Sequence, residues 1–192
     1  MEHTLVLIKP DGVKRALIGD IIHRFERAGL KVVGLKMVWV DKDLVDKHYP
    51  NEREEFIKGM GQKTLDNYKE LGIDPIERAG TDDPHKIGMM INMWNKELLT
   101  SGPVVAMVLE GNHAITNTRR IVGPTLPSLA APGTIRGDLS LDSSALANEK
   151  KRAIKNLIHA SGNKEEAELE ISLWFTPEEI HTYRRADEEA MF

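Results

Sequence analysis

Residues 4–12 read TLVLIKPDG, and this stretch sets the architecture that the rest of the chain follows. The run TLVLI is short and apolar, which is typical of a buried strand, and KPDG directly behind it indicates a turn. Lys9 is therefore expected at the end of a strand. From Val13 to Ala28, apolar residues recur at helical spacing and Gly29 supplies the stop, so an amphipathic helix with one core face is predicted next.

The same signals repeat further along the chain. Strands are predicted at residues 30–40 and 103–111, where branched apolar residues cluster. Helices are predicted at residues 41–49, 51–58, 112–123 and 164–173. With the strand-like run that ends at His159, the order is strand, helix, strand, helices, strand, helix, strand, which favours a small α+β sandwich with helices over one sheet.

Two segments interrupt this order. Residues 61–95 are polar and repeatedly broken by Gly and Pro, with a short helix expected only at residues 64–71, so this segment looks inserted. Residues 124–138, PTLPSLAAPGTIRGD, are dense in Pro and Gly and are not expected to form regular structure. A long ordered loop of this kind is usually functional.

The composition limits the class of protein. With 192 residues, of which 41% are hydrophobic and 29% charged, the chain is expected to form one domain with one core. No apolar run approaches the roughly 20 residues of a membrane helix, and the N-terminal run is too short for a signal peptide, so a cytoplasmic protein is expected. The absence of cysteine excludes disulfides and thiolate metal sites. A net charge of −4 argues against general nucleic-acid binding, so a polyanionic ligand would need a local cluster of basic residues.

His159 stands out among the seven histidines. In NLIHASGN, residues 156–163, it follows an apolar run and precedes small residues that leave its ring approachable. Two interpretations stay open: a buried core histidine with satisfied hydrogen bonds, or a reactive nitrogen that needs open space in front of it. His48, which precedes Tyr49, is ambiguous. Surface or capping roles are predicted for the other five, His3, His23, His85, His113 and His181.

Scattered basic residues near turns and helix ends are the candidates for binding phosphate: Lys9, Arg119, Arg120 and Arg136. Arginine binds phosphate through its planar fork and lysine as a point charge. The alternative is that each of these cations pairs with one of the 30 acidic residues. No Walker motif and no Rossmann glycine fingerprint occurs, so a conventional ATPase or protein kinase is not expected.

The chain resembles the nucleoside diphosphate kinase family in six blocks that occur in this order: LIKPDGVKRALIGDIIHRFERAGLKVVGLKM, HY, SGPVVAMVLEG, PGTIRGD, NLIHASG and EISLWF. The resemblance implies a ferredoxin-like βαββαβ sandwich, with a four-stranded antiparallel sheet covered by helices, assembled into a homo-oligomer that in this family is most often a hexamer. It also implies transfer of the γ-phosphate of a nucleoside triphosphate such as ATP to a nucleoside diphosphate, by a ping-pong mechanism through a phosphohistidine. Magnesium would be held chiefly by the nucleotide phosphates and water, and no protein ligand to it is expected.

The resemblance assigns roles to catalytic residues position by position. His159 matches the phosphorylated histidine, and Glu170 matches the carboxylate that accepts a hydrogen bond from the other ring nitrogen. Lys9 and Tyr49 match residues near the transferred phosphoryl group. Ser161 matches a serine that is hydrogen-bonded close to the histidine.

The nucleotide-binding residues follow from the same resemblance. Arg119, Thr125 and Arg136 match the residues that hold the phosphates, together with Lys9, and Asn156 matches the residue that contacts the ribose. Phe56 matches the aromatic residue that stacks on the base if one residue is deleted between Tyr49 and Gly59. The alternative for Phe56 is that it belongs to the core of its own short helix.

Departures from the family pattern leave a second function open. We expect a single domain over residues 1–192, with insertions at about 61–95 and about 140–150, both beside the base-binding slot. Gly162 replaces an aspartate that is common in the family, which puts any water-mediated contact of that carboxylate to the metal in doubt. The alternative function is a catalytically altered, nucleotide-binding regulatory or scaffold protein of the same fold. Neither a nucleic acid nor a membrane is expected as a partner.

Overall fold

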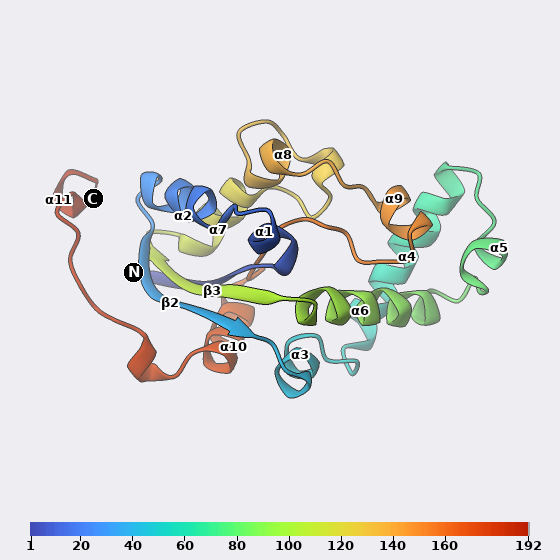
Figure 1. Cartoon of the computed structure of the whole chain (residues 1–192), viewed down its shortest axis with the longest axis horizontal. Coiled ribbons are helices and arrows are strands. Elements are labelled where there is room, and N and C mark those ends of the chain that lie inside the picture. The colour runs from blue at the N-terminus through green and yellow to red at the C-terminus, as the bar shows by residue number, and fades with distance from the viewer. Residues whose placement is uncertain (192) are drawn as a thin grey trace.

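A four-stranded antiparallel sheet forms the centre of the computed structural model, which describes residues 1–191 (Figure 1). Its strands lie in the order β2-β3-β1-β4. Their bounds are Glu2–Ile8 for β1, Lys31–Trp39 for β2, Pro103–Gly111 for β3 and Ile158–Ala160 for β4. The α+β class and the ferredoxin-like sheet expected from the sequence are confirmed.

Helices cover both faces of the sheet. One face packs against α1 (Pro10–Lys14), α2 (Ile18–Arg27), α7 (Ala114–Val122) and α8 (Ile135–Leu139). The other face packs against α3 (Lys42–His48) and α10 (Lys164–Trp174). Successive side chains of a strand point to opposite faces, so Val6 and Ile8 enter the first core while Leu5 and Leu7 enter the second. A strand buried on both faces must be apolar throughout, which explains the uninterrupted run near the N-terminus.

The single helix predicted from Val13 to Ala28 is wrong, because the chain forms two helices there. Helix α1 begins directly after Lys9 with Pro10 in its first turn, where proline is well tolerated. Ala16 then adopts a positive φ of 57°, which breaks the helical path before α2 starts at Ile18.

The segment expected to be an irregular insertion is mostly helical. The helix predicted within it at residues 64–71 and the helix predicted before it at residues 51–58 form one helix, α4 (Glu54–Glu70). It is followed by α5 (Pro75–Ala79) and α6 (Pro84–Thr100). The Pro residues mark helix starts rather than breaks. Asp83 caps α6 by accepting a hydrogen bond of 2.8 Å from the backbone N–H of His85.

The Pro- and Gly-rich segment that follows α7 also contains short helices, so the expectation of no regular structure is wrong in part. These helices are η1 (Pro127–Leu129), α8 and, beyond it, α9 (Ser144–Glu149). Near the C-terminus lie η2 (Pro177–Glu179) and α11 (Glu188–Met191). Among residues 1–191, no helix combines the length and the apolar character needed to cross a membrane.

Two glycines allow α4 and α6 to pack at very short range. A Cβ atom at Gly61 would lie 1.8 Å from the carbonyl oxygen of Pro84, and one at Gly88 would lie 1.9 Å from that of Ile57. Each obstacle is backbone, which cannot rotate away as a side chain can. The two helices therefore depend on the absence of a side chain at both positions.

We predict that Gly61→Ala lowers the free energy of unfolding by about 1–3 kcal/mol, because the added methyl group forces the two helices apart. Gly59→Ala on the same helix is the matched control, since a Cβ at that position meets nothing within 4 Å. Alanine favours helix, so the control should raise the stability by up to about 1 kcal/mol. Urea titrations of both variants measure this, and equal effects would show that the close packing has been misjudged.

Candidate functional site

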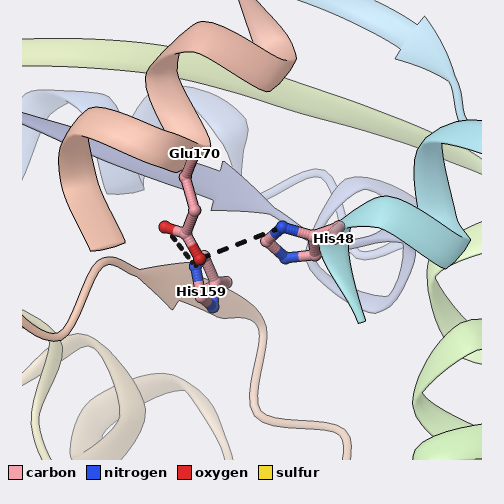
Figure 2. Close-up of side chains that lie close together, drawn as sticks. All are labelled: His48, His159 and Glu170. Atoms are coloured by element: carbon pink, nitrogen blue, oxygen red, sulfur yellow. Dashed lines mark hydrogen bonds and ion pairs between the residues drawn. The ribbon is translucent and has the colours of Figure 1, made fainter. Parts of the chain in front are cut away.

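A hydrogen-bonded pair formed by His159 and Glu170 lies at the centre of the site (Figure 2). His159 projects from the short strand β4, and Glu170 projects from α10 across it. The imidazole Nε2 lies 2.9 Å from Oε1 and 3.0 Å from Oε2 of the carboxylate. Because an ionised carboxylate can only accept, Nε2 carries a proton, and in the neutral imidazole Nδ1 then keeps a free lone pair. The His159 side chain is 21% exposed, so this nitrogen belongs to a ring that is not sealed in the core.

Glu170 is held in place by Ser161. The Ser161 hydroxyl donates to Oε2 of Glu170 at 2.6 Å and accepts the backbone N–H of Leu5 at 3.3 Å. Burial alone would raise the pKa of Glu170, but the charge and hydrogen bond of His159, with a smaller effect of His48, lower it to about 2. The carboxylate is therefore ionised at any working pH and fixes the orientation of the imidazole.

The turn that leads into β4 has an unusual backbone. Leu157 adopts a positive φ of 68°, a left-handed conformation that branched or bulky residues rarely adopt. Its N–H donates to Oδ2 of Asp11 at 2.9 Å, and its carbonyl oxygen accepts the backbone N–H of Lys9 at 2.8 Å. The turn after β1 thus clamps the turn before His159 from both sides. Sequence reasoning gave Asp11 no role, although it belongs to the KPDG motif.

His48, whose role the sequence left open, lies beside His159 and Glu170. Its ring meets the His159 ring edge-on, with 4.8 Å between centroids (Figure 2). Its Nδ1 accepts the indole N–H of Trp174 at 3.4 Å and lies 3.9 Å from Oε1 of Glu170. Burial, together with the repulsion that a protonated His159 would exert, lowers the pKa of His48 to about 3, so the His48 ring stays neutral. Adjacency to Tyr49 was the only sequence signal that pointed to it.

His48, His159 and Glu170 are the group in residues 1–191 that could share a metal ion, because one ligand atom of each lies within 4.8 Å of the others. Two of these three groups are already joined by the hydrogen bond at Nε2 of His159. A nucleotide-bound metal would therefore take its ligands from phosphate and water rather than from this group.

Lys9 is buried and lies at the end of β1, where its backbone N–H donates to the turn that precedes His159. Burial lowers the pKa of Lys9 to about 8, the carboxylate of Asp11 opposes this, and the positive charge of Arg136 adds to it. A lysine with this pKa is charged at neutral pH but less strongly hydrated than a surface lysine. It is suited to binding an anion.

Arg136 is buried, and its guanidinium donates three hydrogen bonds to backbone carbonyl oxygens. Its Nη1 donates to the carbonyl oxygen of Gly123 at 2.9 Å, its Nη2 to that of Ile158 at 2.6 Å and its Nε to that of Asn156 at 3.2 Å. Burial and the nearby charge of Arg119 lower the pKa of Arg136 to about 10, so it remains a cation. The residue supports the chain around His159 and also contributes positive charge.

The remaining predicted residues surround these groups. Asn156 is buried and donates from Nδ2 to the carbonyl oxygen of Thr125 at 2.8 Å, while its Oδ1 has no hydrogen-bond partner in residues 1–191. Thr125 is exposed. Burial raises the pKa of the Tyr49 hydroxyl, and the charge of Glu170 raises it further, so Tyr49 is a hydrogen-bond donor and not an anion.

Phe56 is not part of the core, because 47% of it is exposed. The guanidinium of Arg53 lies 4.8 Å from the centroid of its ring. Arg53 in turn pairs with Glu166 at 3.0 Å. Glu166 also accepts the backbone N–H of Gly162 at 3.0 Å, and its carboxylate fills the space where a side chain at position 162 would lie. An acidic group is therefore present here although residue 162 has no side chain.

The charges of the site favour an anionic ligand. Within residues 1–191, none of Lys9, Arg119, Arg120 and Arg136 forms an ion pair with a carboxylate, so the alternative that each of these cations pairs with an acidic residue is wrong. A neutral imidazole with one free nitrogen, in a site that also holds cations without a direct ion-pair partner, can attack an electrophile that carries several negative charges.

Known proteins share this sequence and this fold. A family model described as nucleoside diphosphate kinase matches residues 2–62 and 92–180. A nucleoside diphosphate kinase of Pyrobaculum aerophilum is 51% identical over 180 residues, which are 94% of this chain and 98% of that protein. A crystal structure of an NDP kinase from the same organism superposes with a TM-score of 0.91 at 50% identity, covering 94% of this chain and 99% of the other.

A third comparison concerns a structure with bound ligands. The nucleoside diphosphate kinase of Borrelia burgdorferi, described as a transition-state mimic with bound vanadate and ADP, superposes with a TM-score of 0.76 at 38% identity. The match covers 97% of this chain and 94% of that one.

We predict that Asp11→Ala lowers the free energy of unfolding by about 1–3 kcal/mol, because it leaves the buried N–H of Leu157 without a partner. Asp20→Ala is the control: Asp20 is exposed, and its contact with Arg24 is 3.8 Å long, so a change within about 0.5 kcal/mol is expected. Chemical denaturation measures both values. A loss at Asp11 no greater than that at Asp20 would contradict the clamp on the Leu157 turn.

Proposed function

The chain belongs to the nucleoside diphosphate kinase family and is a nucleoside diphosphate kinase, and we propose that the phosphoryl group it transfers passes through Nδ1 of His159. The observation that carries this proposal is the hydrogen bond of 2.9 Å from Nε2 of His159 to Glu170. It fixes the tautomer in which Nδ1 is free to attack. No general base is needed, because the attacking nitrogen carries no proton.

The reaction then consists of two in-line displacements. In the first, the Nδ1 lone pair forms a bond to the γ-phosphorus of a nucleoside triphosphate while the bond from phosphorus to the bridging oxygen breaks, and the nucleoside diphosphate leaves with those electrons. In the second, a terminal oxygen of another nucleoside diphosphate attacks the same phosphorus, and the N–P bond returns its electrons to Nδ1. Nε2 keeps its proton throughout, because Glu170 remains its acceptor.

Positive charge around the phosphorus supports both displacements. The transition state spreads negative charge over the equatorial oxygens, so catalysis depends mainly on positioning and electrostatics. We assign to Lys9 and to the neutral hydroxyl of Tyr49 the task of stabilising the transferred group. Arg119, Thr125 and Arg136 hold the other phosphates.

Nucleoside recognition follows from the residues at the edge of the site. Phe56 is exposed, so its ring is available for stacking with a base. The guanidinium of Arg53 lies beside this ring and forms an ion pair with Glu166. Stacking does not depend on the identity of the base, which suits an enzyme that accepts several nucleotides. We assign the ribose contact to Asn156, whose buried Oδ1 lacks a partner.

Members of this family use a divalent metal ion with their nucleotides. We propose Mg²⁺, which prefers oxygen ligands and is commonly bound through substrate phosphates. The ion would neutralise phosphate charge when bound. The homo-oligomeric state, with a hexamer as first expectation, and the cytoplasmic location belong to the same proposal.

The domain organisation is also proposed. We treat residues 1–192 as one domain with insertions at about 61–95 and about 140–150. The omission of residues 63–91 from the family match supports the first insertion.

The direct test uses γ-labelled ATP with Mg²⁺. Wild-type protein should acquire an acid-labile, base-stable label, and His159→Ala should acquire none, because no other group in the proposal accepts phosphate. Label that persists on His159→Ala would defeat the assignment.

The contribution of the Glu170 carboxylate is measured in the same assay. Glu170→Gln should slow the labelling by about 10²- to 10³-fold, since the ionised acceptor that fixes the imidazole is lost. Glu168→Gln, an exposed change on the same helix, should leave the rate unchanged.

The pKa of Lys9 predicts an alkaline limit to activity. Lys9 is protonated below its pKa of about 8 and loses its charge as the pH rises through that value. We expect kcat/KM to fall about tenfold between pH 7.5 and pH 9. In Lys9→Arg the residue stays charged, so the ratio of kcat/KM at these two pH values should return close to one, whatever the absolute rate. An unchanged alkaline limb in that variant would show that another group causes it.

A further inference from the structure

A cavity lies at the end of the molecule where α4, α5, α6 and α9 come together, away from the sheet (Figure 1). Its volume is about 300 Å³, at the lower end of the range for small-molecule sites. None of the residues assigned to phosphoryl transfer or nucleotide binding lines it. Six of its lining residues carry the argument: Tyr68, Arg78, Met90, Trp94, Asn148 and Lys151.

The cavity belongs to the two segments proposed as insertions. Tyr68, Arg78 and Met90 lie within residues 63–91, which the family model does not match. Asn148 belongs to α9, in the second segment. The two segments also touch directly, because the Ser144 hydroxyl donates to Oδ1 of Asn67 on α4 at 3.2 Å. Each insertion thus supplies part of the wall around one space.

Aromatic side chains make one part of this wall rigid and apolar. Tyr68 is 2% exposed and Trp94 6% exposed, so both rings are fixed by packing. Met90 lines the same space with an adaptable thioether. Flat rings beside a polarizable side chain favour a ligand that itself has a flat ring.

The polar part of the wall is positively charged. Arg78 and Lys151 make no hydrogen bond from their side chains and no ion pair with any carboxylate in residues 1–191, and both line the cavity. Arg78 lies close to Tyr68, since its charge opposes the rise in the pKa of Tyr68 that burial causes. Glu77 is the one acidic residue in the lining, so the lining has a net charge of +1.

A buried donor without a partner completes the polar part. Nδ2 of Asn148 is buried and has no hydrogen-bond acceptor in residues 1–191. Asn148 lines the cavity, and leaving its buried amide N–H unpaired is unfavourable. The cavity therefore combines fixed aromatic rings, two free cations and an unpaired donor.

We infer that this cavity is a second ligand site, separate from the phosphoryl-transfer site, for a small aromatic carboxylate. The ring would pack against Trp94 and Tyr68, and the carboxylate would accept hydrogen bonds from Arg78 and Lys151. The single net positive charge suits a monoanion better than a doubly charged phosphate ester. The site goes beyond the kinase reaction and does not depend on it.

The test uses 1-naphthoate as the probe and its uncharged amide, 1-naphthamide, as the comparison. Binding is followed by ligand-observed saturation-transfer NMR on the full chain, with saturating ADP and Mg²⁺ present so that the nucleotide site is filled. We expect 1-naphthoate to bind and 1-naphthamide to bind about tenfold more weakly, because the amide loses the charge-assisted hydrogen bonds. No binding of the carboxylate, equal binding of the two compounds, or displacement by ADP would overturn the proposal.

Reversing the charges of Arg78 and Lys151 tests whether 1-naphthoate binds in this cavity. The double variant Arg78→Glu/Lys151→Glu should weaken 1-naphthoate by at least about tenfold, since like charges then face the carboxylate. Lys63→Glu/Lys69→Glu is the matched control, because both lysines are exposed on α4 and neither lines the cavity. It should bind 1-naphthoate as wild type does. Both variants should keep phosphoryl-transfer activity, which verifies folding, and equal affinity of the two variants would place the probe elsewhere.

Discussion

The hydrogen bond between His159 and Glu170 is the contact on which the proposed phosphoryl transfer depends. It links a strand of only three residues, β4, to α10, a helix that packs on one face of the sheet, so both elements must be in place before the imidazole has a defined proton. Ser161 and Leu5 fix the carboxylate, and Asp11 and the backbone of Lys9 hold the strained turn at Leu157. The packing of the sheet thus determines which nitrogen of His159 is left without a hydrogen-bond partner in the pair.

The elements with a strong local pattern were predictable from the sequence. Strand β3 occupies the nine residues Pro103–Gly111 that its apolar run indicated, because a strand buried on both faces leaves a continuous signal. The break at Ala16 and the length of α4 were not predictable. Nothing in the local pattern distinguishes a residue with positive φ from its helical neighbours, and Gly and Pro mark helix boundaries as often as loops.

The site likewise contains residues that could be predicted from the sequence and residues that could not. Family resemblance pointed to His159, Glu170 and Ser161, and the structure brings their side chains into one hydrogen-bonded group. The roles of Asp11 and His48 were not predicted, because their hydrogen-bond partners are distant in the sequence. Leu157, the partner of Asp11, is 146 positions away, and Trp174, the partner of His48, is 126 positions away. A contact of that kind arises from the topology of the sheet and has no periodic trace in the chain.

Helix α4 runs without interruption from the aromatic ring at its start, Phe56, to the one near its end, Tyr68. Twelve residues at 1.5 Å each make a rod of about 18 Å. The close backbone contact with α6 at Gly61 and Gly88 lies between these two rings. A tilt of α4 about this contact would move both of its ends, so a change in packing around Tyr68 would also shift Phe56, the ring proposed to stack on a base.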